Sequence, residues 1–167
     1  WSSDVCSSDL IRILSNESGV GALAFMENNA SMLPEAEVSY YFRPYYDKSR
    51  KDEANYYAQW QYVGVPFSDA APFHYFFYGG YIEKWEESQY DWVQIKNGSD
   101  ESLTSPEAFR GYAFTKQGTS EGYYNSSTGT LNPTQTKALH LDYSNTAIVP
   151  GRNLFANSWT SPIYVDA

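Results

Sequence analysis

The stretch that decides the fold reads YYAQWQYVGVPF and covers residues 56–67 of the 167-residue chain. Tyr, Trp and Val favour strands, because aromatic and β-branched side chains pack well on a pleated, half-buried surface. This run is the strongest strand pattern in the sequence, and we expect the longest strand near residues 56–65.

Shorter runs of the same kind lie on both sides of it. The alternation is clearest in residues 137–143, where Leu139, Leu141 and Tyr143 share one face of a strand. Clusters of Gly, Asn and Ser separate the runs, among them residues 126–129. Many short strands at this spacing predict an all-β, antiparallel β-sandwich or jelly-roll-like fold. The expected strands are residues 11–14, 19–25, 37–43, 73–78, 81–85, 90–96, 109–115, 122–125, 137–143 and 152–156.

Residues 48–55 are charged and lack an apolar stripe, which predicts a solvated loop and the best domain boundary. Residues 1–10, WSSDVCSSDL, resemble the translation of a sequencing adapter, so we leave them out of the fold prediction. The only cysteine, Cys6, lies in that segment. We therefore expect no disulfide or thiolate chemistry in the remainder of the chain.

Charge and hydropathy exclude several classes of partner. The formal net charge is −9, which repels a phosphate backbone or an anionic lipid surface, and no basic stripe offsets it. No run approaches the roughly 20 apolar residues that cross a bilayer as a helix. We expect neither nucleic-acid binding nor membrane insertion.

Two patterns with catalytic precedent are better explained without catalysis. Ser120 lies in a G-x-S-x-G match, but the residues after it, 123–129, are rich in turn formers, whereas a nucleophile elbow needs a helix there. His74 and His140 fall on different expected strands without further ligands at zinc spacing. We expect no catalytic residue, no metal site and no cofactor.

An acidic and aromatic cluster is the best candidate for a ligand site. Rings on a strand surface pack against the C–H faces of sugars, while carboxylates and amides accept hydrogen bonds from sugar hydroxyl groups. Paired carboxylates beside aromatics also suit a glycosidase. A third interpretation makes the rings core residues and the acids a solvated turn. The candidate binding residues are Trp85, Tyr90, Trp92, Gln94, Glu83, Glu87 and Asp91, with Tyr90, Trp92 and Gln94 on one strand face; the candidate catalytic cluster is Glu83, Glu86, Glu87 and Asp91.

Five short elements resemble, in order, a β-rich module of large secreted and cell-surface proteins of Bacteroidota. They are WQYVGVP at 60–66, YDW at 90–92, FRGYA at 109–113, GTLN at 129–132 and GRNLFANSWTSPI at 151–163. The chain departs from the pattern at Gln61 and at Ser158-Trp159. The resemblance implies that residues 11–47 end a preceding repetitive β region and that 56–167 form the module, truncated at its C-terminus.

The resemblance also implies export, often by type IX secretion, and brings no catalytic residues. We therefore expect a non-enzymatic surface module, extracellular or on the outer cell surface, that serves binding or adhesion. Its expected partners are an extracellular glycan or a host or matrix protein, besides neighbouring domains of the parent chain. The alternatives are a glycoside hydrolase-like domain and a structural spacer.

Overall fold

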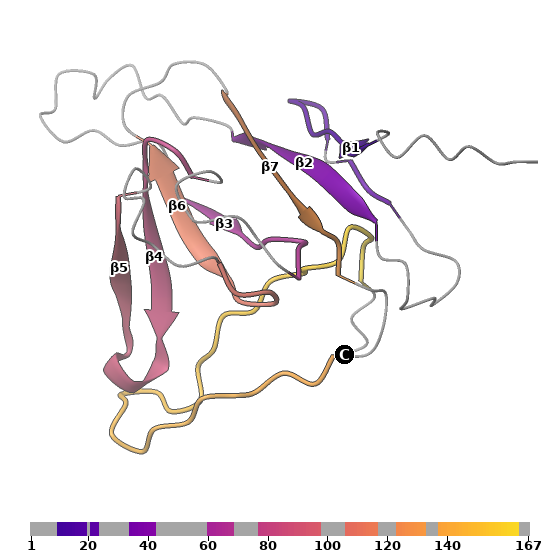
Figure 1. The fold of residues 1–167 in the computed structure, drawn as a ribbon. Helices are drawn as coiled ribbons and strands as arrows, with labels where there is room; N and C mark the ends of the chain where they lie inside the picture. The colour runs from indigo at the N-terminus through magenta and orange to yellow at the C-terminus, as the bar shows by residue number, and fades with distance from the viewer. Residues whose placement is uncertain are drawn as a thin grey trace, which may run out of the picture.

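Two β-sheets form the ordered framework of the chain (Figure 1). The computed structural model describes residues 10–19, 21–23, 34–42, 60–68, 77–97, 106–116, 123–132 and 137–163. The first sheet has the order β1-β2-β7, with β1 Ile11–Ile13, β2 Glu35–Phe42 and β7 Tyr123–Thr130. The second has the order β3-β6-β4-β5, with β3 Gln61–Val63, β6 Tyr112–Lys116, β4 Gly80–Glu86 and β5 Asp91–Asn97.

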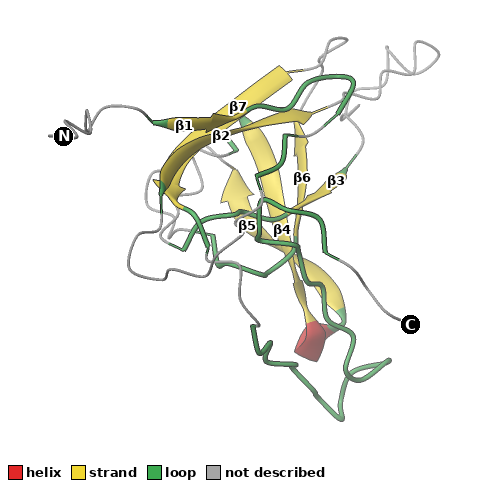
Figure 2. Cartoon of the chain, turned by 90° about the vertical axis from the view of Figure 1, so that its right-hand side faces the viewer, coloured by secondary structure: helices red, strands yellow, loops and turns green. Residues whose placement is uncertain are grey.

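The predicted all-β class is confirmed. Within the described residues the only helical element is the 3-10 turn η2, Glu87–Gln89, which joins β4 to β5 and is red in Figure 2. The four-stranded sheet is antiparallel throughout, and β2 pairs antiparallel with β7 along all eight residues. Only the short pair of β1 and β2 is parallel.

The core lies between the two sheets and is dominated by aromatic rings. Phe114 of β6 lies 4.7 Å from Phe42 of β2 and 5.1 Å from Phe77, measured between ring centroids. Gly80 permits this packing, since a Cβ atom at this position would overlap the Phe114 ring. The cluster is completed by Ile13, Ala36, Val38, Val65, Phe67, Ile82, Tyr112 and Leu131.

The core joins residues from both sides of the predicted domain boundary. Val38 and Phe42 precede residues 48–55, whereas Tyr112 and Phe114 follow them, and all four belong to one cluster. The β2–β7 ladder likewise joins 35–42 to 123–130. The described parts of 11–47 and 56–167 therefore share a sheet and a core. Of residues 1–10 only Leu10 is described, and it is exposed.

One predicted turn is wrong, because residues 126–129 belong to β7. Ser and Gly favour turns in isolation. Here β2 supplies ladder partners for all four residues, pairing Ser126 with Ser39 and Gly129 with Ala36. The tertiary partner thus overrides the local preference.

Two predicted strands are also absent. Residues 137–143 form no strand, and in 152–156 only Phe155 makes a bridge, to Arg110. The apolar face predicted for 137–143 is exposed at Leu139, Leu141 and Tyr143. Alternation predicts a strand only where a partner edge is within reach, and no described strand pairs with this segment.

The described part of the opening stretch is shorter than predicted. β3 spans three residues, whereas β2 and β7, with eight each, are the longest described strands. The strand ends at Val63. The carbonyl oxygen of the next residue, Gly64, accepts a hydrogen bond of 2.8 Å from the Tyr40 hydroxyl, and Pro66 lacks the N–H to continue a ladder. Residues 56–59, Cys6, His74 and Ser120 lie outside the described residues.

Two further expected strands are described only in part, and their described residues form no strand. Gly19 makes a single bridge to Asn16, and residues 21–23 form no strand. Phe77 and Tyr78 lie in the bend and turn before β4. The other residues of 19–25 and 73–78 lie outside the described residues.

Candidate functional site

Three rings lie side by side on the face of the four-stranded sheet that points away from the core. We name Tyr62, Trp92 and Trp85 the aromatic strip. The rings of Tyr62 and Trp92 are stacked, with centroids 5.8 Å apart and planes 13° apart, and Trp85 meets Trp92 edge-on at 5.6 Å. Tyr62 is 72% exposed, and both tryptophans are half-buried. The strip therefore presents aromatic surface to solvent.

The strand register brings these rings together from three strands. Tyr62 of β3 pairs with Ala113 of β6, Ala113 pairs with Glu83 of β4, and Trp85 of β4 pairs with Trp92 of β5. Side chains at paired and alternate positions share a face, so all of them point to the outer side of the sheet. Two positions lie between Tyr62 and β5 in this row: Ala113 of β6, which carries only a methyl group, and Glu83 of β4.

Arg152 fixes the orientation of Trp85. Its backbone carbonyl oxygen accepts a hydrogen bond of 2.6 Å from the Trp85 indole Nε1. Its guanidinium carbon lies 5.9 Å from the ring centroids of both Trp85 and Tyr90, and its Nη1 donates to the Tyr90 hydroxyl at 3.0 Å. Cation–π contacts of this kind hold rings in place.

The prediction that Tyr90 shares a strand face with Trp92 and Gln94 is wrong for Tyr90. Tyr90 precedes β5, with a left-handed φ of 51°, and caps η2. Its ring packs edge-on against Trp85 at 5.2 Å and therefore supports the strip from the side. Trp92 and Gln94 do lie on β5 with the predicted alternation.

The polar neighbours of the strip come from the same hairpin. Glu83 and Gln94 are paired across β4 and β5, one position along from Trp85 and Trp92 on the same face. Burial raises the pKa of Glu83 above its ordinary value, and the nearby charge of Asp91 raises it further. Asp91 is exposed, and its Oδ1 accepts the Trp92 backbone N–H at 2.8 Å.

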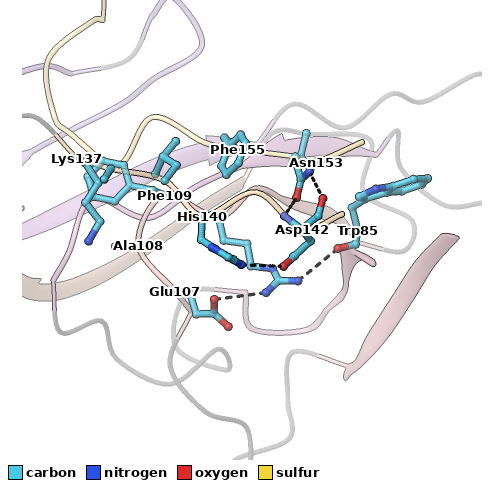
Figure 3. A pocket seen from close by; sticks show the side chains of 13 residues that line it. Trp85, Glu107, Ala108, Phe109, Lys137, His140, Asp142, Asn153 and Phe155 are labelled. Atoms are coloured by element: carbon cyan, nitrogen blue, oxygen red, sulfur yellow. Dashed lines mark hydrogen bonds and ion pairs between the residues drawn. The ribbon is translucent and has the colours of Figure 1, made fainter. Parts of the chain in front are cut away.

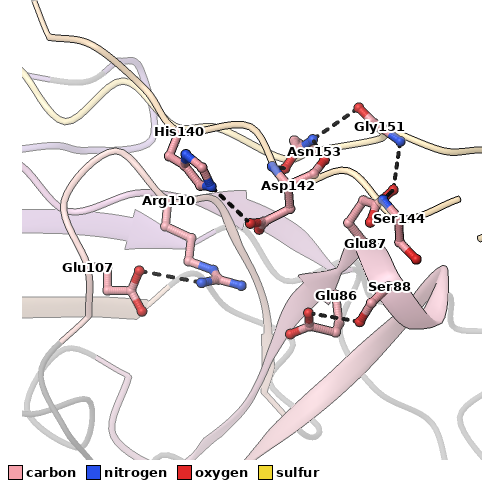
Figure 4. Close-up of polar contacts among 10 residues, drawn as sticks. All are labelled: Glu86, Glu87, Ser88, Glu107, Arg110, His140, Asp142, Ser144, Gly151 and Asn153. Carbon is pink, nitrogen blue, oxygen red and sulfur yellow. Dashed lines mark hydrogen bonds and ion pairs between the residues drawn. The ribbon is translucent and has the colours of Figure 1, made fainter.

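Glu87 lies outside the candidate site. Its side chain is 2% exposed, and its Oε1 accepts the backbone N–H groups of Ser144 at 3.0 Å and of Gly151 at 2.6 Å (Figure 4). These bonds tie the loop 144–151 to η2, beside which the loop runs in Figure 2. Glu87 is therefore a structural anchor and has no free face for a ligand.

A pocket of about 380 Å³ opens beside Trp85 (Figure 3). Arg110 reaches across it, with Nη1 3.4 Å from Glu107 Oε2 and Nη2 3.4 Å from the Trp85 carbonyl oxygen. The opposite wall is the segment 137–142, held by Asn153. Phe109 lines the pocket with a φ of 65°, unusual for a bulky residue.

The described residues bring no metal-binding set together: no group of three or more His, Cys, Asp or Glu side chains converges among them. Within the same residues, no helix has the length and apolar character that crossing a bilayer requires.

Fold and site together define a two-sheet all-β chain that carries an aromatic strip on its outer face. No family model, curated protein or solved structure matches the chain. Tyr62 and Arg152 belong to the strip and its support, and the sequence prediction did not include them. Tyr62 and Trp92 lie on the two edge strands, β3 and β5, with β6 and β4 between them. That strand order was not readable from alternation.

Proposed function

We propose that this chain is a non-catalytic binding module of a secreted or cell-surface protein, and that the aromatic strip binds carbohydrate. The observation that carries the proposal is the stacked pair Tyr62–Trp92, which leaves Tyr62 72% exposed. Exposing an aromatic face to water costs free energy. That free energy is recovered when the C–H face of a sugar covers the ring.

The polar groups around the strip support a sugar over a purely apolar ligand. Glu83 and Gln94 lie on the same face as Trp85 and Trp92, where a carboxyl group and an amide offer acceptors and donors to hydroxyl groups. An extracellular glycan is the proposed partner. If the strip covers a protein surface instead of a glycan, the proposed role is adhesion to a host or matrix protein. The sequence pattern supports an extracellular or outer-surface location.

The test is a binding screen of the full chain against cello-, xylo-, manno- and chito-oligosaccharides and uronate oligomers, followed by calorimetric titration of the best ligand. Trp92→Ala is expected to weaken binding about tenfold or more, which corresponds to about 1.4 kcal/mol. The matched control is Tyr78→Ala, a tyrosine 65% exposed outside the strip, which should bind as the parent does. Equal affinity of Trp92→Ala and the parent contradicts the proposal.

A glycan-degrading activity is the second candidate, and the upward direction of the Glu83 pKa shift favours it, because a general acid needs a pKa above that of an ordinary carboxyl group. Glu87 is not available as its partner, since it anchors the loop 144–151. Release of reducing ends from the same oligosaccharides, abolished by Glu83→Gln, would establish the enzyme. Binding without release supports the module.

A further inference from the structure

The segment 137–143 has the alternating composition of a strand, but it pairs with no described strand. No backbone hydrogen bond joins residues 137–141 to any other part of the described chain. The side chains of Leu139, Leu141 and Tyr143 are 41%, 60% and 73% exposed. Unpaired N–H and C=O groups beside an exposed apolar row form a template for another strand.

One edge of this segment is already occupied. The Asp142 N–H donates to Asn153 Oδ1 at 3.0 Å, and Asn153 Nδ2 donates to the Asp142 carbonyl oxygen at 2.9 Å (Figure 3). In an extended chain the backbone groups of alternate residues point to opposite edges. The Asp142 groups therefore lie on the edge that Asn153 occupies. The groups of residues 139, 141 and 143 face the other edge, where no described backbone group bonds to them.

The sequence of the segment is complementary to itself when two copies run antiparallel about His140. Leu139 then lies opposite Leu141 of the second copy, and Lys137, whose Nζ lies 5.7 Å from the Phe109 ring centroid, lies opposite Tyr143. Lys137 and Asp142 make the segment formally neutral in a chain with net charge −9, so the two copies meet there without like-charge repulsion.

We propose that residues 137–143 pair with the same residues of a second copy, forming a two-fold symmetric dimer through the open edge of 139, 141 and 143. The pairing is independent of sugar binding, because none of its residues belongs to the aromatic strip. In this register Leu139 and Leu141 exchange hydrogen bonds, whereas the two His140 residues form the non-hydrogen-bonded pair on the axis.

Disulfide trapping tests the register directly. Non-hydrogen-bonded antiparallel pairs have Cα atoms about 4.5 Å apart, inside the disulfide range of roughly 4.4 to 6.8 Å. In a Cys6→Ser background, His140→Cys is expected to form a covalent dimer under mild oxidation. Ala138→Cys is the matched control, since its two copies would lie four residues apart along the strands, about 13 Å. Equal cross-linking of both variants, or of neither, overturns the proposal.

Sedimentation velocity gives a second readout that needs no cysteine. The parent chain is expected to shift from monomer to dimer with rising concentration, and Leu141→Lys is expected to raise the dissociation constant at least tenfold. Ile148→Lys is the control, because Ile148 is 83% exposed but lies outside the pairing segment. A parent that stays monomeric throughout, or equal effects of the two lysine variants, contradicts the dimer.

Discussion

The two faces of the four-stranded sheet carry aromatic rings with opposite fates. On one face Tyr112 and Phe114 are buried against β2 of the other sheet, while on the opposite face Tyr62 remains 72% exposed. The strands are the same on both faces and so is their register. Only the covering element differs, since a whole sheet covers one face and the segment 152–156 contacts part of the other, at Gly64 and Gly111.

This difference teaches that alternation defines two faces but does not say which one becomes core. Burial follows from what lies above each face, and that is a property of the topology. Aromatic residues left on the uncovered face of a stable sheet are then free to serve a ligand. The predictions below separate the two faces by their effect on stability.

The largest effect is expected for Phe114→Ala. Phe114 is fully buried and contacts Phe42 and Phe77, so its removal loses apolar burial and leaves a cavity. The expected loss in the free energy of unfolding is about 3–5 kcal/mol, measured by urea denaturation. A loss below about 1 kcal/mol, the range of surface changes, would mean that this face is not the core.

An intermediate effect is expected at η2, the turn that joins β4 to β5. Glu87→Ala removes the acceptor for two backbone N–H groups of the loop 144–151 and should cost about 2 kcal/mol. Glu87→Gln keeps an oxygen at the same position and should retain most of that stability. Limited proteolysis measures how firmly the loop 144–151 is held. We expect faster cleavage within this loop in the alanine variant alone. Identical cleavage of both variants would show that Glu87 does not anchor the loop.

Alkaline pH should weaken the buried face of the four-stranded sheet. Burial raises the pKa of Tyr112 from its ordinary value of 10.0 to about 12. The folded state disfavours the phenolate, so this stability is fully present below pH 10 and is lost as the pH rises through about 12. The parent should therefore lose more stability than Tyr112→Phe between these values, in urea unfolding at fixed pH steps. Parallel curves contradict this role of Tyr112.

Sequence patterns predicted most of the sheet but not its boundaries. Residues 37–43, 81–85 and 90–96 correspond to β2, β4 and β5. Each of these runs alternates, and each pairs with a neighbouring strand. Residues 137–143 alternate as clearly, yet they form no strand. Residues 126–129 look like a turn and lie within β7. Local preference yields to the presence or absence of a partner edge in both cases.

The site was predictable only within one hairpin. Trp85, Trp92, Glu83 and Gln94 are close in sequence, and a β4–β5 turn suffices to bring them together. Tyr62 and Arg152 come from distant parts of the chain. Glu87 belongs by sequence to the acidic cluster, but its carboxylate accepts hydrogen bonds from the loop 144–151. The two donors, Ser144 and Gly151, lie 57 and 64 positions further along the chain.

The smallest effect on stability is expected for the strip. Tyr62→Ala should change the free energy of unfolding by less than about 0.5 kcal/mol, because the ring is mostly in water. The same variant should weaken oligosaccharide binding about tenfold, so stability and binding separate on this face. A loss of stability as large as that of Phe114→Ala would make Tyr62 a core residue and remove the comparison.

The most direct test of the strip as a ligand surface follows the tryptophan indole N–H signals by NMR during titration with the best oligosaccharide of the screen. Trp92 should shift most and Trp85 less, since the Trp85 indole N–H is already bonded to Arg152. Trp159, which packs edge-on against Phe109 at 4.7 Å away from the strip, should stay in place. Shifts of Trp92 and Trp85 that saturate with ligand are the predicted result. A saturating titration in which only Trp159 moves, or in which no indole signal moves with any oligosaccharide, would contradict the account.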